Sequence, residues 1–178
     1  MSQAKRNAAF EALPANEKRV LIARDVIAQL AIGKLEAQSG TYVETDATVK
    51  KASQDLQVLL KPKDVSCTVC GIGALFVCGV QRGNDLKASS VHLFEDDNVN
   101  VGGFQAYAYL RRYFSNSQLK MIEAAFEQWA HDKGGDFAYY VEDDETRLRL
   151  IMENIILNNG TFNPAMEVAE GWYVVQKV

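Results

Sequence analysis

The most recognisable chemical pattern in the sequence is a pair of cysteines, Cys67 and Cys70, separated by two residues. This CxxC spacing is typical of two zinc ligands or of the two thiols of a redox pair. A zinc site needs further ligands, and the remaining candidates are Cys78, His92 and His131. Because unpaired cysteine is among the most often buried residue types, we predict structural cysteines and no metal site. The alternatives are zinc bound by Cys67, Cys70 and His92, or a redox pair formed by the two CxxC thiols.

The segment that carries these cysteines, residues 67–80, is apolar on nearly every side and reads CTVCGIGALFVCGV. It is too short to span a bilayer, so we predict a central buried helix with Ser66 as its N-cap. Its three glycines are poor helix formers, which leaves a buried strand as the alternative. In one continuous helix, Cys78 would lie about 16 Å along the axis from Cys67 and could not bind the same ion.

A second candidate for function is the aromatic segment 104–114, FQAYAYLRRYF. On a helix its tyrosines and arginines fall on two faces, which cannot both be buried. Arginine beside tyrosine is typical of protein interfaces, since both side chains give a large contact area. We therefore predict a partner-binding surface made of Tyr107, Tyr109, Arg111, Arg112 and Tyr113. The alternative is that Phe104, Tyr107, Leu110 and Phe114 pack inside while the arginines reach solvent.

Other patterns that could carry catalysis or bind a cofactor are incomplete. Gly71 and Gly73 begin a dinucleotide-binding pattern, but Phe76 stands where its third glycine is needed. No GxSxG motif presents a serine nucleophile. The acidic run at 142–145 precedes an apolar helical pattern, where carboxylates are expected to cap a helix. We therefore expect no catalytic residue and no cofactor.

The hydrophobic periodicity predicts a mainly α fold of about five to six helices with a few short strands, or an α+β fold as the alternative. The junction at Ser115 and Gln118 has the pattern of a capping box. Helical patterns cover residues 16–35, 50–61, 67–80, 104–114, 114–131 and 144–160, and strand-like patterns cover residues 40–46, 136–141 and 172–178. No linker or repeat divides the chain, so we expect a single globular domain over residues 1–178.

The composition of the chain disfavours several classes of protein. The 178 residues are 48% hydrophobic and carry a net charge of −4, which does not favour binding to nucleic acid. We see neither a secretory signal nor an apolar stretch long enough for a membrane span. With three cysteines and no such signal, the sequence predicts reduced thiols and a cytoplasmic protein.

Four segments together resemble small uncharacterised proteins encoded by phages and prophages. They are RVLIARDVIAQL, CTVCGIGALFV, YFSNSQLKMIEAAFE and RLIMENIILNNGTF. These segments consist of core and capping residues, so the resemblance implies a genomic setting and no particular chemistry. In that setting, an accessory factor that binds a host protein is the role that the resemblance implies.

The sequence as a whole favours a non-catalytic protein that binds another macromolecule, with a protein as the expected partner. A homo-oligomer built on residues 104–114 is one alternative, and neither nucleic acid nor a membrane is expected as a partner. A zinc- or thiol-dependent enzyme or redox protein that uses Cys67 and Cys70 is the alternative of a different class.

Overall fold

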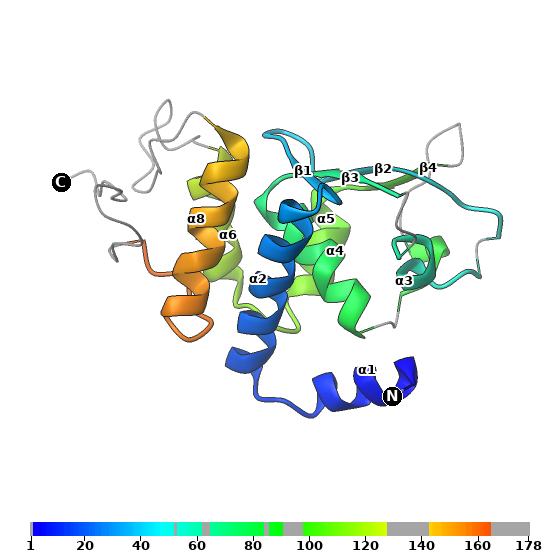
Figure 1. The fold of residues 1–178 in the computed structure, drawn as a ribbon, viewed down its shortest axis with the longest axis horizontal. Helices are drawn as coiled ribbons and strands as arrows, with labels where there is room; N and C mark the ends of the chain where they lie inside the picture. Colours follow the sequence, from blue (N-terminus) through cyan, green and yellow to red (C-terminus); the bar gives the residue numbers. More distant parts are fainter. Residues whose placement is uncertain are drawn as a thin grey trace.

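The structure is a computed structural model of the 178-residue chain, and it describes residues 2–51, 53–61, 65–83, 86–90, 98–127 and 143–164. The described part is mainly helical with one small sheet, an α+β arrangement that agrees with the sequence prediction (Figure 1). Its helices are α1 (Gln3–Glu11), α2 (Ala15–Ala31), α3 (Leu56–Leu59), α4 (Gly71–Gly83), η1 (Ala88–Ser90), α5 (Gly103–Leu110), α6 (Asn116–Glu127) and α8 (Asp144–Leu157). Its strands are β1 (Leu35–Ala37), β2 (Val43–Thr48), β3 (Cys67–Val69) and β4 (Asn98–Val101).

The sheet has the strand order β1-β3-β2-β4. Strand β3 pairs in parallel with β1 and antiparallel with β2, so it lies between two strands that follow each other in the sequence. Strand β2 alternates buried and exposed residues along its whole length, as expected when one face of a sheet packs on helices. The registers align Ala37, Val69, Val43 and Val101 in one row. The C-terminal ends of β1, β3 and β4 therefore lie at the same edge of the sheet.

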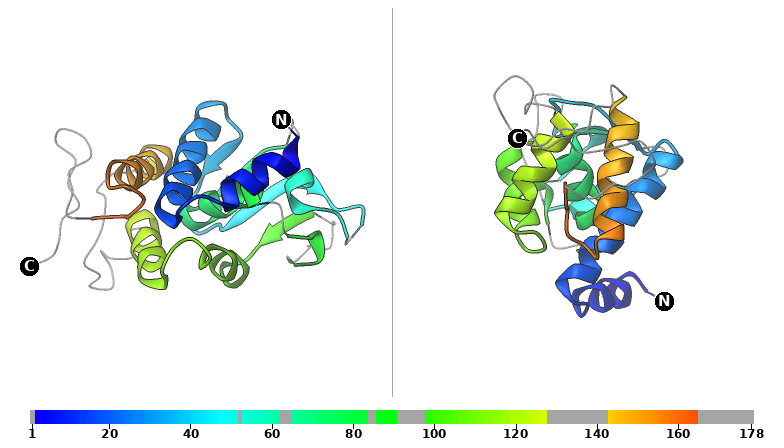
Figure 2. Two further views of the ribbon diagram at one scale, coloured as in Figure 1. Left: turned by 90° about the horizontal axis from the view of Figure 1, so that it is seen from below. Right: turned by 90° about the vertical axis from the view of Figure 1, so that its left-hand side faces the viewer.

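Helix α4 is the centre of the molecule, and all ten residues from Gly71 to Val80 are buried. Figure 2 shows α1 and α2 on one side of α4 and α5 on the other. The predicted continuous helix over residues 67–80 is wrong at its start, because Cys67–Val69 form strand β3 instead. The backbone of these three residues pairs with two neighbouring strands, and that pairing outweighs the helical apolar pattern.

A single glycine allows α4 to lie close to the sheet. A Cβ atom added at Gly73 would lie 1.5 Å from the carbonyl oxygen of Tyr42, which precedes β2. Only glycine can occupy this position without moving the helix away from the sheet. Glycine is a poor helix former, but the packing of α4 on the sheet depends on Gly73.

The helix-capping predictions hold for α8 and in part for α6, and α2 begins earlier than its predicted range. Asp143 caps α8 by accepting a hydrogen bond from the Thr146 amide at 2.6 Å. Ser115 Oγ accepts from the Gln118 amide at 3.2 Å, which is half of the predicted capping box before α6. Helix α2 begins at Ala15, one residue earlier than predicted, with Pro14 at its N-cap.

Several helices are shorter than predicted. Helix α2 ends at Ala31, before the strand that begins at Leu35, and α3 covers only Leu56–Leu59 of the predicted range 50–61. Helix α5 ends at Leu110, so the predicted helix over 104–114 is too long, and Arg111 is its C-cap. Helix α1 was not predicted, since only Phe10 within it is buried and no apolar stripe marks it. Other predicted features lie outside the described residues: His92, His131, the strand at 136–141 and the tail at 172–178. None of the helices in the described part is long and apolar enough to cross a membrane.

Candidate functional site

The tyrosines of the predicted partner-binding surface are engaged in contacts within the chain. Tyr109 and Tyr113 are buried, with 5% and 4% of their surface exposed, and their rings pack edge to face at 5.9 Å. The Tyr109 hydroxyl donates to the Gly79 carbonyl at 3.0 Å, and the Tyr113 hydroxyl donates to Glu11 at 3.1 Å. These two rings attach α5 and the turn after it to α4 and α1. Tyr109 and Tyr113 therefore contribute mainly to the packing of this region.

The two arginines of the same segment are exposed, as in the alternative interpretation of the sequence. The Arg112 guanidinium lies 5.1 Å from the ring centre of Tyr109 and 5.6 Å from that of Tyr113. Its Nη2 atom is 4.0 Å from a Glu11 carboxylate oxygen. The Arg111 guanidinium donates to Asn116 at 3.2 Å. The Arg112 guanidinium thus packs against the two buried tyrosine rings while its charged end stays at the surface.

An exposed phenylalanine lies at the start of α5, at the opposite end of this helix from Arg112. Phe104, in the first turn of α5, has 85% of its surface exposed, although the alternative interpretation placed it in the core. It borders a groove of about 330 Å³, which we call the α5 groove. The spacing Phe104, Ala108, Arg112 could have indicated this face, since residues four apart lie above one another on a helix. The groove is lined by Phe76, Leu86, Ser90, Phe104, Gln105, Ala108, Tyr109 and Arg112.

The three cysteines are buried free thiols. Burial raises the pKa of Cys67 to about 11 and that of Cys70 to about 12, and it also raises the pKa of Cys78. Because β3 and α4 are separate elements, the axial distance predicted between Cys67 and Cys78 does not apply. Among the described residues, no three His, Cys, Asp or Glu side chains are grouped as metal ligands. The zinc alternative depends on His92, which lies outside that part of the chain, so it stays a prediction.

Cys70 belongs to a polar cluster at the sheet edge where β1 and β3 end. It directly precedes α4 and lies near the Glu127 carboxylate, which accepts a hydrogen bond from the Gly40 amide at 2.8 Å. Burial raises the pKa of Glu127. The neighbouring Glu123 carboxylate accepts from the hydroxyls of Tyr42 and Tyr107. Burial, followed by these bonds to Glu123, raises the pKa of both tyrosines, so both hydroxyls stay protonated as donors.

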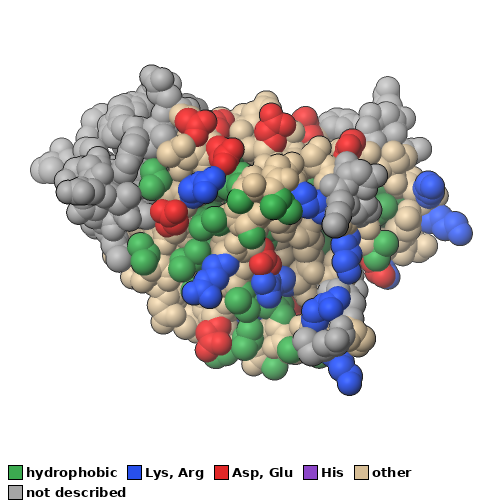
Figure 3. Space-filling view, viewed as in Figure 1, with side chains coloured by type: hydrophobic (Ala, Val, Ile, Leu, Met, Phe, Trp, Pro, Cys, Tyr) green, Lys and Arg blue, Asp and Glu red, His purple; other side chains and the backbone are tan. Residues whose placement is uncertain are grey.

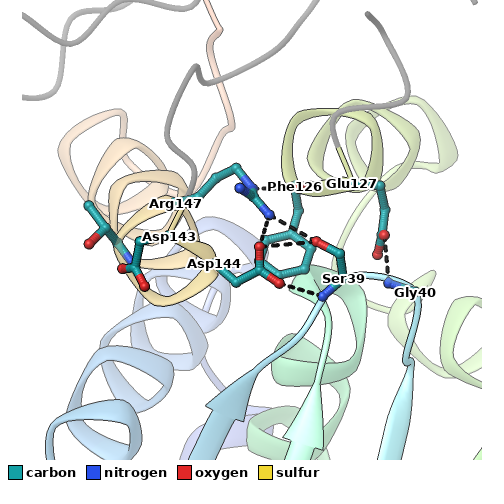
Figure 4. Close-up of polar contacts among 8 residues, drawn as sticks. Ser39, Gly40, Phe126, Glu127, Asp143, Asp144 and Arg147 are labelled. Atoms are coloured by element: carbon teal, nitrogen blue, oxygen red, sulfur yellow. Dashed lines mark hydrogen bonds and ion pairs between the residues drawn. The ribbon is translucent and has the colours of Figure 1, made fainter. Parts of the chain in front are cut away.

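A buried arginine extends this cluster from α6 to α8 (Figure 4). Arg147 is 2% exposed, and its Nε donates to the Phe126 carbonyl at 2.6 Å. Its Nη2 donates to Ser39 Oγ at 2.9 Å and to the Asp144 carboxylate. Asp144 in turn accepts from the Ser39 amide at 2.6 Å. The guanidinium also lies 5.0 Å from the ring centre of Phe126. The sequence did not indicate this role, because nothing near Arg147 in the sequence marks it as buried.

The arrangement of this cluster indicates a structural junction. The Ser39 and Gly40 amides, in the turn after β1, donate to carboxylates of α8 and α6. The Arg147 guanidinium donates to the Phe126 carbonyl of α6 and to the Ser39 hydroxyl. The Cys70 thiol, which could act as a nucleophile after deprotonation, stays protonated at neutral pH because its pKa is near 12. The exposed α5 groove is therefore the better candidate for function among the described residues.

Comparison with known proteins found no matching family model, no matching curated protein and no matching solved structure.

Proposed function

We propose that this chain is a non-catalytic protein that binds another protein through the α5 groove. The observation that carries the proposal is the 85% exposure of Phe104 at the border of that groove. Burying a phenylalanine side chain stabilises a complex by roughly 1.5–3 kcal/mol, so an exposed ring beside an apolar hollow favours association. Well-packed aromatic and arginine side chains are also the residues that most often dominate the energy of protein interfaces.

The chemistry of the groove indicates what a partner would present to it. Phe76 and Tyr109 give the groove aromatic walls, which suit an apolar side chain inserted from the partner. Arg112 at the border, with Arg111 beside it, suits a carboxylate next to that apolar side chain. A net charge of −4 and only two adjacent arginines favour a protein over nucleic acid.

The resemblance to phage proteins suggests that the partner is a protein of the host cell. The thiol-dependent alternative receives no support from the described residues, since burial keeps Cys67 and Cys70 protonated at neutral pH. Binding of a second copy of the chain to the same surface is the alternative. Sedimentation of the purified protein, with no partner present, distinguishes it from binding of a different protein.

Affinity purification from the native host with a Phe104→Asp variant tests the proposal. We expect one protein to co-purify with the unchanged chain and to be lost with Phe104→Asp, because a carboxylate cannot enter an apolar pocket without a large desolvation cost. The matched control is Leu157→Asp, which changes a side chain of 59% exposure on α8 and should retain the partner. Direct titration of the purified partner should then show at least a tenfold weaker affinity for Phe104→Asp alone.

Two results would contradict the proposal. Equal loss of the partner with both variants would place the contact elsewhere. Sedimentation of the unchanged protein as a dimer that Phe104→Asp dissociates would instead assign the groove to self-association.

A further inference from the structure

A second hollow is lined by residues of α1, α2, α3 and the end of α4, four elements labelled in Figure 1. This basic cavity has a volume of about 460 Å³, within the range of roughly 300–1,000 Å³ found for small-molecule sites. It shares no lining residue with the α5 groove. Its lining includes four cationic side chains and one carboxylate: Arg6, Lys34, Lys61, Arg82 and Asp25.

The lining is strongly positive in a protein that is negative overall. Four cations and one carboxylate give a lining charge of +4 − 1 = +3, whereas the whole chain carries −4. In the space-filling view, Lys and Arg side chains gather on the half of this face that carries α1 and α3, and many Asp and Glu side chains lie along its upper edge (Figure 3). A hollow lined by one sign of charge concentrates ions of the opposite sign. The basic cavity therefore attracts anions.

Two of these cations, Arg82 and Lys34, are fixed by contacts within the chain. The single carboxylate, Asp25, is held by both nitrogens of an Arg82 fork at 2.5 and 2.6 Å. The Lys34 ammonium donates to the carbonyl oxygens of Leu60 and Lys61 at 3.3 and 3.1 Å, and these acceptors carry no formal charge. Both arrangements fix a cationic group at the wall of the cavity before any ligand arrives, which lowers the entropic cost of binding.

Three glutamines from three helices form the polar part of the lining. The Gln29 amide nitrogen donates to the Gln81 side-chain oxygen at 2.6 Å, and the Gln81 amide nitrogen donates to the Leu60 carbonyl at 3.1 Å. Gln57 is 3% exposed and donates to the Gln81 backbone carbonyl. The Gln29 side-chain oxygen is buried and has no hydrogen-bond partner among the described residues. Leaving such an acceptor unsatisfied costs about 1–3 kcal/mol, so the cavity suits an occupant that supplies a donor.

We propose that the basic cavity binds a small organic phosphate that carries hydroxyl groups, such as a sugar phosphate. Three excess positive charges favour a dianionic phosphate over a monoanionic carboxylate. The phosphate lies against the lysines and arginines, and the Gln29 amide, whose oxygen is buried in the structure, turns toward the cavity to accept a hydrogen bond from a hydroxyl of the same molecule. This site is independent of the proposed binding of a protein partner.

Calorimetric titration of the full chain with glucose 6-phosphate, glycerol 3-phosphate and AMP tests the proposal. We expect at least one of them to bind with a Kd below about 1 mM and to raise the melting temperature. Glucose lacks the anion and should not bind. Inorganic phosphate lacks the hydroxyl donors and should bind at least tenfold more weakly than the best organic phosphate.

Variants of the lining locate the bound molecule. We expect Arg6→Gln/Lys61→Gln to weaken binding of the best organic phosphate at least tenfold, whereas Lys50→Gln, an exposed lysine outside the lining, should not change it. Gln29→Met should weaken binding of the organic phosphate and leave that of inorganic phosphate unchanged, since only the former supplies the hydroxyl. Circular dichroism melts confirm that each variant is folded.

Three outcomes would overturn the proposal. The first is that none of the three organic phosphates binds the folded chain, which would mean a cavity filled by water only. The second is that inorganic phosphate binds as tightly as the organic phosphates, which would mean a simple anion site. The third is binding that Arg6→Gln/Lys61→Gln leaves unchanged, which would place the site elsewhere.

Discussion

Arg147 shows how one side chain can join three segments that are distant in the sequence. It is 2% exposed and donates hydrogen bonds to Phe126, Ser39 and Asp144. Ser39 is 108 residues away from it along the chain. A buried charge contributes to stability only while its partners are in place, and removing one partner leaves the others unsatisfied in a medium of low polarity.

We therefore expect Arg147→Met to lower the free energy of unfolding by about 3 kcal/mol, because three acceptors lose a donor and little apolar packing is gained. Urea denaturation measures the change. The matched control is Arg149→Met, two residues along the same helix, where a half-buried arginine pairs with the exposed Glu145 at 2.8 Å. This solvent-accessible pair should contribute about 0.5 kcal/mol or less. Equal losses for the two variants would show that the buried network adds no stability.

At the scale of elements, the contact between α4 and the sheet depends on Gly73. The carbonyl oxygen that a new Cβ would meet at 1.5 Å belongs to the backbone of Tyr42, so it cannot rotate away as a side chain can. The ring of Tyr42 is also close to Gly103, where an added Cβ would lie 2.5 Å from it. Tyr42 therefore contacts both α4 and α5, through its backbone at Gly73 and through its ring at Gly103.

We expect Gly73→Ala to prevent folding or to lower the melting temperature by more than 10 °C, since a change of several kcal/mol shifts a domain of this size by that amount. Gly79→Ala is the comparison, because its Cβ would lie 3.2 Å from the Tyr109 ring, which can shift slightly. The decrease in melting temperature of Gly79→Ala should be clearly smaller than that of Gly73→Ala. Thermal melts followed by circular dichroism measure both. A Gly73→Ala protein as stable as Gly79→Ala would contradict the close approach of α4 to the sheet.

The sequence predicts those elements whose signals are local. Asp143 and the apolar spacing of Leu148, Ile151 and Ile155 lie within a few residues of one another, and α8 forms as they indicate. The start of α4 was mispredicted, because strand β3 is selected by its pairing with β1 and β2 and not by its own sequence. The predicted partner-binding surface shares only Tyr109 and Arg112 with the lining of the α5 groove. Its two arginines are exposed, but Tyr109 and Tyr113 are buried against Arg112, because their rings pack on α4 and α1. The basic cavity gave no sequence signal, since its lining comes from segments spread over residues 6–82.

At the scale of the whole molecule, the α5 groove and the basic cavity lie against the same central helix. Phe76 on α4 lines the groove, and Gln81 and Arg82 near its end line the cavity. Ten successive buried residues hold this helix in the core, so it is a rigid support for both hollows. Sites that share no residue and no movable element are expected to act independently.

We expect Phe104→Asp to leave the affinity for the organic phosphate unchanged within about 0.5 kcal/mol, because the two hollows share no lining residue. Arg6→Gln/Lys61→Gln should likewise leave the affinity for the protein partner unchanged. Calorimetric titration of each variant with each ligand measures this. A tenfold effect of either substitution on the other site would show that α4 couples the two hollows.

The insertion of β3 between β1 and β2 also determines the order in which the chain can fold. β1 and β2 are joined by residues 38–42 but do not pair with each other, so they cannot form a hairpin on their own. Neither strand can pair until Cys67–Val69 have been synthesised. Strand β2 gains its second neighbouring strand only when Asn98–Val101 are present. During synthesis, a nascent chain that ends before residue 67 therefore has no sheet, and its first pairing closes a loop of more than twenty residues.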